Sequence, residues 1–302
     1  MTETTRLLKM SPICHNSSRM ADIIFVHGLG GSPRGTWHPK GKENDDNFWL
    51  TWLGEDFQNY GIWSLGYEVE PFRWRGETMP LVDRATNILA LLDAHDIGHH
   101  PILFVTHSMG GLLIKQLLRQ AYDYGNPDWR SIAETTQGII YLSTPHSGSG
   151  LANWIDKMGI LQSSVSVEEL QAHHPRLREL NEVYRNHEQL RAIKIQVYCE
   201  KKKIKGFLVV DETSATPGIP GVTPIPTDCD HLSICRPDSR ESLVYLSVRK
   251  FIQRCSLDIN SRKFNTQEKN QKSLASGSAS RIFVGGNYIG DNAQITGNII
   301  SE

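Results

Sequence analysis

One stretch of the chain, residues 102–118, constrains the fold more than any other. Four apolar residues, Ile102 to Val105, lead directly into Thr106-His-Ser-Met-Gly-Gly111, and an amphipathic helical pattern follows without a gap. A buried strand, a tight turn and a helix in succession are the setting in which a serine is presented at the edge of a parallel sheet as a nucleophile. The helix N-terminus adds unpaired N–H groups and a partial positive charge beside the Ser108 hydroxyl.

The turn departs from the usual G-x-S-x-G pattern, because Thr106 stands where the first glycine is expected. Its small side chain can fit there, while Gly110 and Gly111 allow the chain to reverse and the helix to pack closely. The alternative is a buried strand followed by a serine-capped helix that has no chemical role. The strand and helix on either side favour the nucleophile interpretation, since the motif requires both.

A second buried strand, Asp22 to Val26, ends in the glycine-rich turn His27-Gly-Leu-Gly-Gly31. In serine hydrolases of this layout, such a turn supplies one oxyanion-hole amide, and the residue after the nucleophile supplies the other. The predicted donors are therefore the main-chain N–H groups of Leu29 and Met109. A phosphate-binding turn is the alternative, but the third glycine of G-x-G-x-x-G is absent at Pro33 and no P-loop Lys-Ser/Thr follows.

The rest of the chain alternates strand and helix patterns, which favours an α/β fold with a mostly parallel sheet and helices on both faces. Residues 151–190 show a mixed helical pattern with many polar positions. In such folds ligands bind at the carboxyl ends of the strands, where both glycine turns lie. Further strands are predicted at Gly66–Phe72, Gln137–Ser143, Ala192–Tyr198 and Gly206–Val210, and helices at Leu81–Asp93 and Ser239–Cys255.

A nucleophilic serine needs a histidine base held by an acid, and in this layout the acid and then the histidine follow the serine. His231 lies in the loop Asp228-Cys-Asp-His-Leu-Ser-Ile-Cys235, although a surface-loop histidine without a role is the alternative. Two acids compete, because Glu200 directly follows one predicted strand and Asp211 ends the next. Glu200 is preferred, since the acid normally leaves the strand before the one that precedes the histidine loop.

Six motifs then occur in order between residues 20 and 255. They are Phe25-Val-His-Gly-Leu-Gly-Gly, Thr36-Trp37, Phe104-Val-Thr-His-Ser-Met-Gly-Gly-Leu-Leu-Ile-Lys115, Leu142-Ser-Thr-Pro-His-Ser-Gly148, Tyr198-Cys-Glu200 and Asp230-His-Leu-Ser-Ile-Cys235. Together they resemble the serine-active-site-containing protein family, relatives of the inositol-deacylase and lipase-like α/β hydrolases. The resemblance implies an α/β-hydrolase fold, a Ser108–Glu200–His231 triad, and esterase or lipid-acyl chemistry, often on membrane-associated substrates.

Composition argues against several other classes of protein. A net charge of −1 gives no electrostatic case for nucleic-acid binding, and no apolar stretch has the length of a membrane-spanning helix. Five scattered cysteines favour a reducing cytosol over a disulfide framework. Cys229, His231 and Cys235 lack a fourth zinc ligand, so we expect no metal and no cofactor. We expect a cytoplasmic protein that can contact membranes peripherally, and the resemblance also implies relatives at mitochondria or the endoplasmic reticulum.

The pattern predicts four segments along the chain. These are a disordered N-terminus at 1–20, the hydrolase domain at 21–256, a flexible polar linker at 257–280 and a β-prone motif at 281–302. The last segment is rich in β-branched and aromatic residues separated by Gly and Asn, and Asp291 is its one charged residue between 282 and 300. Those features are typical of cross-β stacking, and a small hairpin docked on the hydrolase is the alternative.

This last segment resembles the short amyloid signalling motifs that follow effector domains in fungal NLR-linked cell-death systems. The resemblance implies an NLR-type partner that recruits the chain through residues 281–300, and homo-assembly through the same segment. We therefore expect a serine hydrolase that cleaves an acyl ester, with lipid esters included, and that acts as such an effector. The alternative is an inactive α/β-hydrolase scaffold that acts through its tail, which Thr106 leaves open.

Overall fold

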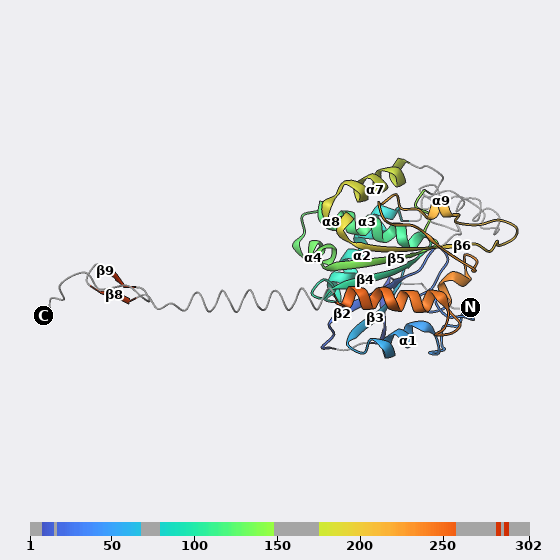
Figure 1. Cartoon of the computed structure of the whole chain (residues 1–302), viewed down its shortest axis with the longest axis horizontal. Helices are drawn as coiled ribbons and strands as arrows, with labels where there is room; N and C mark the ends of the chain where they lie inside the picture. The colour runs from blue at the N-terminus through green and yellow to red at the C-terminus, as the bar shows by residue number, and fades with distance from the viewer. Residues whose placement is uncertain are drawn as a thin grey trace. The chain divides into compact units, whose positions relative to one another are not determined.

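The computed structural model describes residues 8–14, 17–67, 79–147 and 175–257, and the backbone of 282–284 and 287–289 (Figure 1). The chain divides into two units, Met1–Cys255 and Ser256–Glu302. Within the described residues, no helix is both long enough and apolar enough to cross a lipid bilayer.

The first unit is built on a seven-stranded sheet with the strand order β1-β3-β2-β4-β5-β6-β7. Its outer strand β1 pairs antiparallel with β3, and the other neighbouring pairs are parallel. The mostly parallel sheet predicted from the sequence is therefore confirmed. The strands are β1 (Lys9–Cys14), β2 (Ala21–Val26), β3 (Tyr60–Gly66), β4 (Ile102–His107), β5 (Thr136–Leu142), β6 (Lys194–Glu200) and β7 (Ile225–Thr227).

Helices cover both faces of this sheet, as predicted (Figure 1). One face carries α2 (Leu81–Ala94), α3 (Met109–Asp123), α4 (Pro127–Thr135), α7 (Pro175–Asn186) and α8 (Glu188–Ala192). The other face carries α1 (Trp49–Asp56) and a helix over residues 243–257. Two short helices, α9 (Glu212–Ala215) and η1 (Ser233–Cys235), lie in the connections that follow β6 and β7.

The central strands alternate their side chains between two separate hydrophobic cores. Ile24 and Val26 of β2 pack with α2 and α3, whereas Ile23 and Phe25 pack with α1 and the 243–257 helix. This double burial explains why these strands are nearly continuous apolar runs in the sequence. The same alternation places Phe104, Ile139, Tyr141 and Val197 in the first core and Leu103, Val105, Ile140, Leu142 and Tyr198 in the second.

The strand order also decides where a ligand can bind. The connection from β2 through α1 leads outward to β3, whereas the connection from β4 through α3 and α4 leads outward to β5 on the opposite side. Because β2 and β4 are neighbours, the topology switches direction between them, and crevices form at the carboxyl ends of the strands at such a point. The two glycine turns predicted from the sequence follow these two strands.

Two of the predicted boundaries near the N-terminus differ from the structure. Residues 9–14 form β1, although the sequence placed them in a disordered segment at 1–20, and pairing with β3 buries Met10 against the first core. The strand predicted at Gly66–Phe72 is instead β3, Tyr60–Gly66, whose seven residues are all buried. Residues 68–72 of that prediction lie outside the described residues.

The strand predicted at Gly206–Val210 is wrong. Its backbone makes only an isolated bridge between Ile204 and Phe207, and β7 occupies the place beside β6. Val209 and Val210 are buried like strand residues, but their N–H groups donate to a side chain of β6 rather than to a neighbouring strand. The apolar pattern therefore reflects core packing without a sheet ladder.

In the second unit, β8 (Ile282–Val284) and β9 (Asn287–Ile289) pair antiparallel, with Phe283 opposite Tyr288. The rest of the predicted motif at 281–302 and residues 258–280 of the predicted linker lie outside the described residues. Cross-β stacking and a docked hairpin both stay predictions.

Candidate active site

Ser108 lies in the turn between β4 and α3 and has an unusual backbone conformation. Its φ of +53° and ψ of −128° fall in a region that favours glycine, which typically costs another residue about 1–3 kcal/mol. The Ser108 N–H donates to the carbonyl of Leu142 on β5 at 3.0 Å, and its own carbonyl accepts from Gly111 at 3.1 Å. The neighbouring strand and the first turn of α3 therefore both hold the strained residue in place.

Two glycines allow the neighbouring segments to approach this turn. A Cβ on Gly28 would lie 2.7 Å from Ser108 Cβ and 3.3 Å from Ser108 Oγ. A Cβ on Gly110 would lie 2.5 Å from the carbonyl oxygens of Val26 and His27. Any side chain at either position would push the turn after β2 away from the start of α3.

The two predicted oxyanion donors lie beside these contacts. Leu29 follows Gly28 in the turn after β2, and Met109 follows Ser108 as the first residue of α3. Both side chains are buried in the first core. Their main-chain N–H groups thus belong to the two segments that meet at Ser108, and their role in binding an oxyanion stays a prediction.

The hydrogen bond of Thr106 explains how this turn accommodates a side chain where glycine is usual. Thr106 is fully buried, and its Oγ1 donates to the carbonyl of Ile140 on β5 at 2.9 Å. The hydroxyl is therefore directed toward the neighbouring strand. The departure from the usual motif thus adds a link between β4 and β5.

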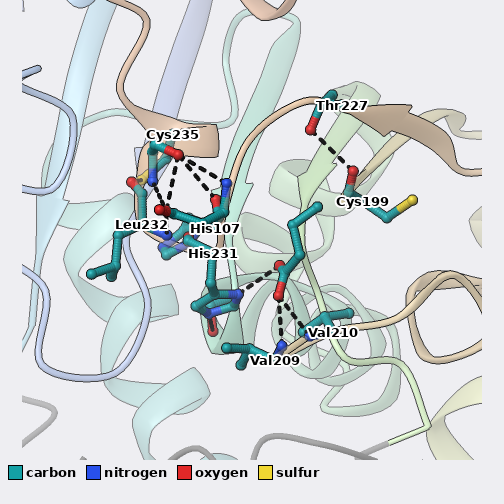
Figure 2. A network of polar contacts seen from close by, with 12 residues as sticks. His107, Cys199, Val209, Val210, Thr227, His231, Leu232 and Cys235 are labelled. Atoms are coloured by element: carbon teal, nitrogen blue, oxygen red, sulfur yellow. Dashed lines mark hydrogen bonds and ion pairs between the residues drawn. The ribbon is translucent and has the colours of Figure 1, made fainter. Parts of the chain in front are cut away.

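His231 joins the serine to an acid in one hydrogen-bonded chain. Its Nε2 lies 3.1 Å from Ser108 Oγ. Its Nδ1 lies 2.9 Å from Glu200 Oε2, and a dashed line from His231 marks this contact (Figure 2). All three residues are buried. With the imidazole neutral and protonated at Nδ1, Ser108 donates to Nε2 and Nδ1 donates to the carboxylate. This is the order of contacts that a nucleophile, a base and an orienting acid require.

Glu200 is the last residue of β6, and main-chain groups hold its carboxylate on the side away from His231. Its Oε1 accepts from the N–H groups of Val209 at 2.8 Å and Val210 at 2.9 Å (Figure 2). Burial alone would raise the pKa of Glu200, but the hydrogen bond and charge of His231 and the amide of Val210 bring the net pKa below its ordinary value. The group is therefore a carboxylate near neutral pH.

Asp211, the competing acid, has a different role in the structure. It is the N-cap of α9, where its Oδ1 accepts from the N–H of Ser214 at 2.7 Å. Such a capping bond satisfies one of the unpaired donors at the start of a helix. Of the two acids, Glu200 is the one that hydrogen-bonds to His231.

Hydrogen bonds join the loop that carries His231 to the segment after β2 and to β6. The carbonyl of Thr36, in the segment after β2, accepts from Arg236 Nε at 3.1 Å and from Cys235 Sγ at 3.3 Å. Where the loop leaves the sheet, Thr227 Oγ1 donates to the carbonyl of Cys199 at 3.0 Å (Figure 2). These contacts hold the start and the end of the histidine loop.

Sequence reasoning missed three residues that structure this site. Val209 and Val210 were interpreted as a strand, because nothing in an apolar pair shows that its amides bind a carboxylate. His107 belongs to the motif around Ser108, which predicts no role for it, and its Nε2 hydrogen-bonds to the main-chain carbonyl of His231 at 2.8 Å. Its position directly before the serine was the one available signal.

Cys229, His231 and Cys235 do not form a metal-binding group among the described residues. Over the described ranges 8–14, 17–67, 79–147 and 175–257, no group of three His, Cys, Asp or Glu side chains is placed to hold a metal ion. Cys229 and Cys235 are free thiols, as are the other three cysteines.

Comparison with known proteins settles the fold. Lipase BlEst2 of Bacillus licheniformis, in its mature form, matches with a TM-score of 0.55 and 18% identity, over 80% of this chain and 98% of the lipase. The chain has an α/β-hydrolase fold. No protein-family model matches the sequence of this α/β-hydrolase chain.

Two vertebrate proteins are similar in sequence. Protein SERAC1 of Danio rerio is 32% identical over 270 residues, which cover 81% of this chain and 40% of the zebrafish protein. Protein SERAC1 of Mus musculus is 31% identical over 268 residues, which cover 80% of this chain and 40% of the mouse protein. The chain thus spans less than half the length of these relatives.

Proposed function

We propose that this chain is a serine hydrolase that cleaves an acyl ester. Ser108 is the nucleophile, His231 the general base and acid, and Glu200 the acid that orients the imidazole. The observation that carries the proposal is the continuous chain of hydrogen bonds from Ser108 Oγ through both nitrogens of His231 to Glu200. Its place at the switch point between β2 and β4 gives further support, because ligands bind there in such sheets.

The reaction follows from these contacts. Ser108 Oγ attacks the ester carbonyl as His231 Nε2 removes its proton, and the N–H groups of Leu29 and Met109 receive the oxyanion. One such donor is typically worth about 3–4 kcal/mol in the transition state. His231 then gives the proton to the leaving alkoxide as the acyl–oxygen bond breaks. A water activated by the same imidazole hydrolyses the acyl-enzyme and restores the Ser108 hydroxyl.

The environment of Glu200 suits this sequence of steps. Its lowered pKa keeps the carboxylate ionised, so it stabilises the imidazolium that forms when His231 takes the proton. The two amides of Val209 and Val210 fix the carboxylate, which in turn fixes the ring orientation. Little reorganisation is therefore needed during the proton transfer.

The proposed substrates are carboxylic esters, with lipid esters as the favoured class. The likeness of the fold to a Bacillus licheniformis lipase and the motif resemblance to lipase-like hydrolases support this choice. We further propose that the chain works in the cytoplasm, where it reaches esters at membrane surfaces by peripheral contact.

The proposal extends to an effector role for the second unit. Residues 281–302 would act as a short amyloid signalling motif through which an NLR-type partner recruits the hydrolase. The support is the β-prone composition between residues 282 and 300, where Asp291 is the single charge, and the pairing of β8 with β9.

Labelling with a fluorophosphonate probe tests the catalytic proposal. The full chain should react covalently at one serine. Ser108→Ala should abolish the reaction while the far-ultraviolet circular dichroism spectrum stays unchanged. Ser239→Ala is the matched control, because Ser239 is exposed and lies outside the site, and it should label like the parent. Labelling that persists in Ser108→Ala would remove this serine from the mechanism, and a parent chain that does not label would favour the inactive scaffold.

A further inference from the structure

His107 makes a direct contact with the main chain of the proposed base. It is the last residue of β4, directly before Ser108, and it is buried. Its Nε2 lies 2.8 Å from the main-chain carbonyl oxygen of His231, and the centroids of the two rings are 4.9 Å apart. A carbonyl oxygen can only accept, so Nε2–H of His107 is the donor, and Nδ1 is unprotonated in the neutral ring.

Burying this imidazole is costly. Within the described part of the chain, Nδ1 of His107 has no hydrogen-bond partner, and an unsatisfied buried polar atom lowers the stability of the fold. Burial, and then the positive charge that His231 can carry, lower the pKa of His107 well below its ordinary value. An apolar ring of similar size would fill the same space without these costs. The hydrogen bond to His231 is the contact that an apolar ring could not make.

The bond links two parts of the site that are far apart in sequence. His107 and His231 are 124 residues apart, and His107 is covalently bonded to the nucleophile residue. Cys235 and Arg236 hydrogen-bond to the carbonyl of Thr36, which lies in the segment after β2 and not in β4. Among the described hydrogen bonds, the one from His107 therefore connects the backbone of the base to the strand that carries Ser108.

We propose that His107 is a positioning residue that holds the His231 imidazole at proton-transfer distance from Ser108 Oγ. This inference rests on the proposed serine-hydrolase function. Without the bond, the 3.1 Å contact between Ser108 and His231 depends on the hydrogen bond from His231 Nδ1 to Glu200 and on main-chain contacts elsewhere in the loop. A misplacement of about 1 Å in a catalytic geometry can cost about 100-fold in rate.

The test compares two substitutions of His107 that differ in hydrogen bonding. His107→Phe keeps a ring of similar size without a donor, whereas His107→Gln places an amide N–H at about the reach of Nε2. His146→Phe is the matched control, because His146 is also buried with a lowered pKa, and within the described residues its ring nitrogens have no partner. The measurements are kcat and KM for p-nitrophenyl butyrate, the rate of fluorophosphonate labelling, and the unfolding temperature.

We expect His107→Phe to lower kcat and the labelling rate by about 10- to 100-fold, with KM changed less than about twofold. Its unfolding temperature should stay close to that of the parent, because the unsatisfied Nδ1 is gone while the His231 carbonyl loses the donor of His107. His107→Gln should recover most of the rate, and His146→Phe should keep kcat. A residue that merely supports the fold would instead lose rate and stability together.

The outcomes separate this inference from the proposed function. A parent chain that neither labels nor hydrolyses the ester overturns the proposed function and this inference with it. A reactive parent with an equally fast His107→Phe overturns the inference alone. So does a His107→Gln that is folded and as slow as His107→Phe. Should His107→Phe fail to fold, the rate of folded His107→Gln decides, since a loss of about 10-fold or more contradicts the proposal.

Discussion

At the scale of single residues, the two oxygens of the Glu200 carboxylate have different partners. One accepts from His231, and the other accepts from the amides of Val209 and Val210. The proposed orienting acid is thus itself held by the main chain of the segment that follows it. This arrangement distinguishes Glu200 from Asp211, whose carboxylate caps a short helix.

Exchanging each acid for its amide should separate these two roles. Glu200→Gln removes the charge beside His231 and should lower kcat by about 10³- to 10⁴-fold, as loss of the orienting acid does in other triads. Asp211→Asn keeps an oxygen that can cap α9, so its kcat should stay within about threefold of the parent. Steady-state ester hydrolysis measures both. The opposite ranking would transfer the orienting role to Asp211.

A second residue-scale feature is the fully buried Lys115 on α3. Its Nζ donates to Asn181 and lies 4.9 Å from the centroid of the Tyr184 ring. Burial, and then the charge of Arg185, lower the pKa of Lys115 to about 7. The unfolded chain should hold this proton up to the ordinary pKa of 10.5.

The free energy of unfolding should therefore depend on Lys115 above neutral pH. Between pH 7 and 10.5 the unfolded state binds the proton more tightly than the folded state, so the Lys115 contribution makes the fold more stable as pH rises, by about 1.4 kcal/mol per pH unit. Lys115→Met should remove this rise and be more stable than the parent at pH 7. Denaturant unfolding of both chains at pH 7.0 and 8.5 measures the difference. A gap between the chains that does not narrow at pH 8.5 would contradict the lowered pKa.

At the scale of elements, the strands that the sequence predicted well are those buried on both faces. Their apolar runs and terminal glycine turns are local signals, and β2, β4, β5 and β6 fall close to their predicted places. β1 was missed because this antiparallel edge strand is short and has no regular alternation of apolar and polar residues, and Met10 is its sole buried residue. The Gly206–Val210 error arose because burial of Val209 and Val210 looks the same in a sequence whether or not a strand forms.

The site could be predicted to a similar extent. Ser108, Glu200 and His231 each stand next to a strand end or in a loop after one, and fold topology ranks such positions. The hydrogen bond of His107 could not be predicted, because its partner is a main-chain carbonyl 124 residues away. The hydrogen bonds from the Val209 and Val210 amides could not be predicted for a similar reason, because every residue type except proline has a main-chain N–H donor.

The link between β4 and β5 gives a prediction at this scale. Thr106→Val keeps the shape of the side chain and removes the hydroxyl that donates to the Ile140 carbonyl, so it should lower the free energy of unfolding by about 1 kcal/mol. Thr106→Gly restores the usual motif, but it should cost more, because it also leaves a cavity and loosens the backbone. Denaturant unfolding of the two variants compares them. A Thr106→Gly chain as stable as the parent would show that the hydroxyl has no structural value.

At the scale of the whole molecule, we expect the first unit to fold and to react without the second. The second core is complete by Cys255, which is buried, whereas Leu257 is exposed. Removal of residues 258–302 should therefore leave unfolding temperature and fluorophosphonate labelling unchanged while abolishing higher-order assembly. Size-exclusion chromatography and labelling of the truncated and full chains measure both. Unfolding of the truncated chain would favour a tail docked on the hydrolase.

A peptide of residues 281–302 tests the assembly directly. Its β-branched and aromatic residues should form thioflavin-positive fibrils with the ~4.7 Å spacing between stacked strands. Ile289→Asp should block them, because a charge buried between stacked strands is costly. Fibre diffraction of both peptides distinguishes the cases, and a parent peptide that stays monomeric would remove the main support for the effector role.

The division of β2, β4, β5 and β6 between two cores has a consequence for how such a chain can change during evolution. Side chains in each of these strands alternate between the two faces with a period of two residues. Inserting or deleting one residue would therefore exchange the two faces for every side chain beyond it. Ile23 and Phe25 would then meet α2 and α3, and Ile24 and Val26 would meet α1. Segments that follow the strands, such as 201–224 between β6 and β7, are not bound by this two-residue alternation. Changes of chain length should therefore accumulate at the carboxyl edge of the sheet, where they alter the surroundings of Ser108 and leave both cores in register.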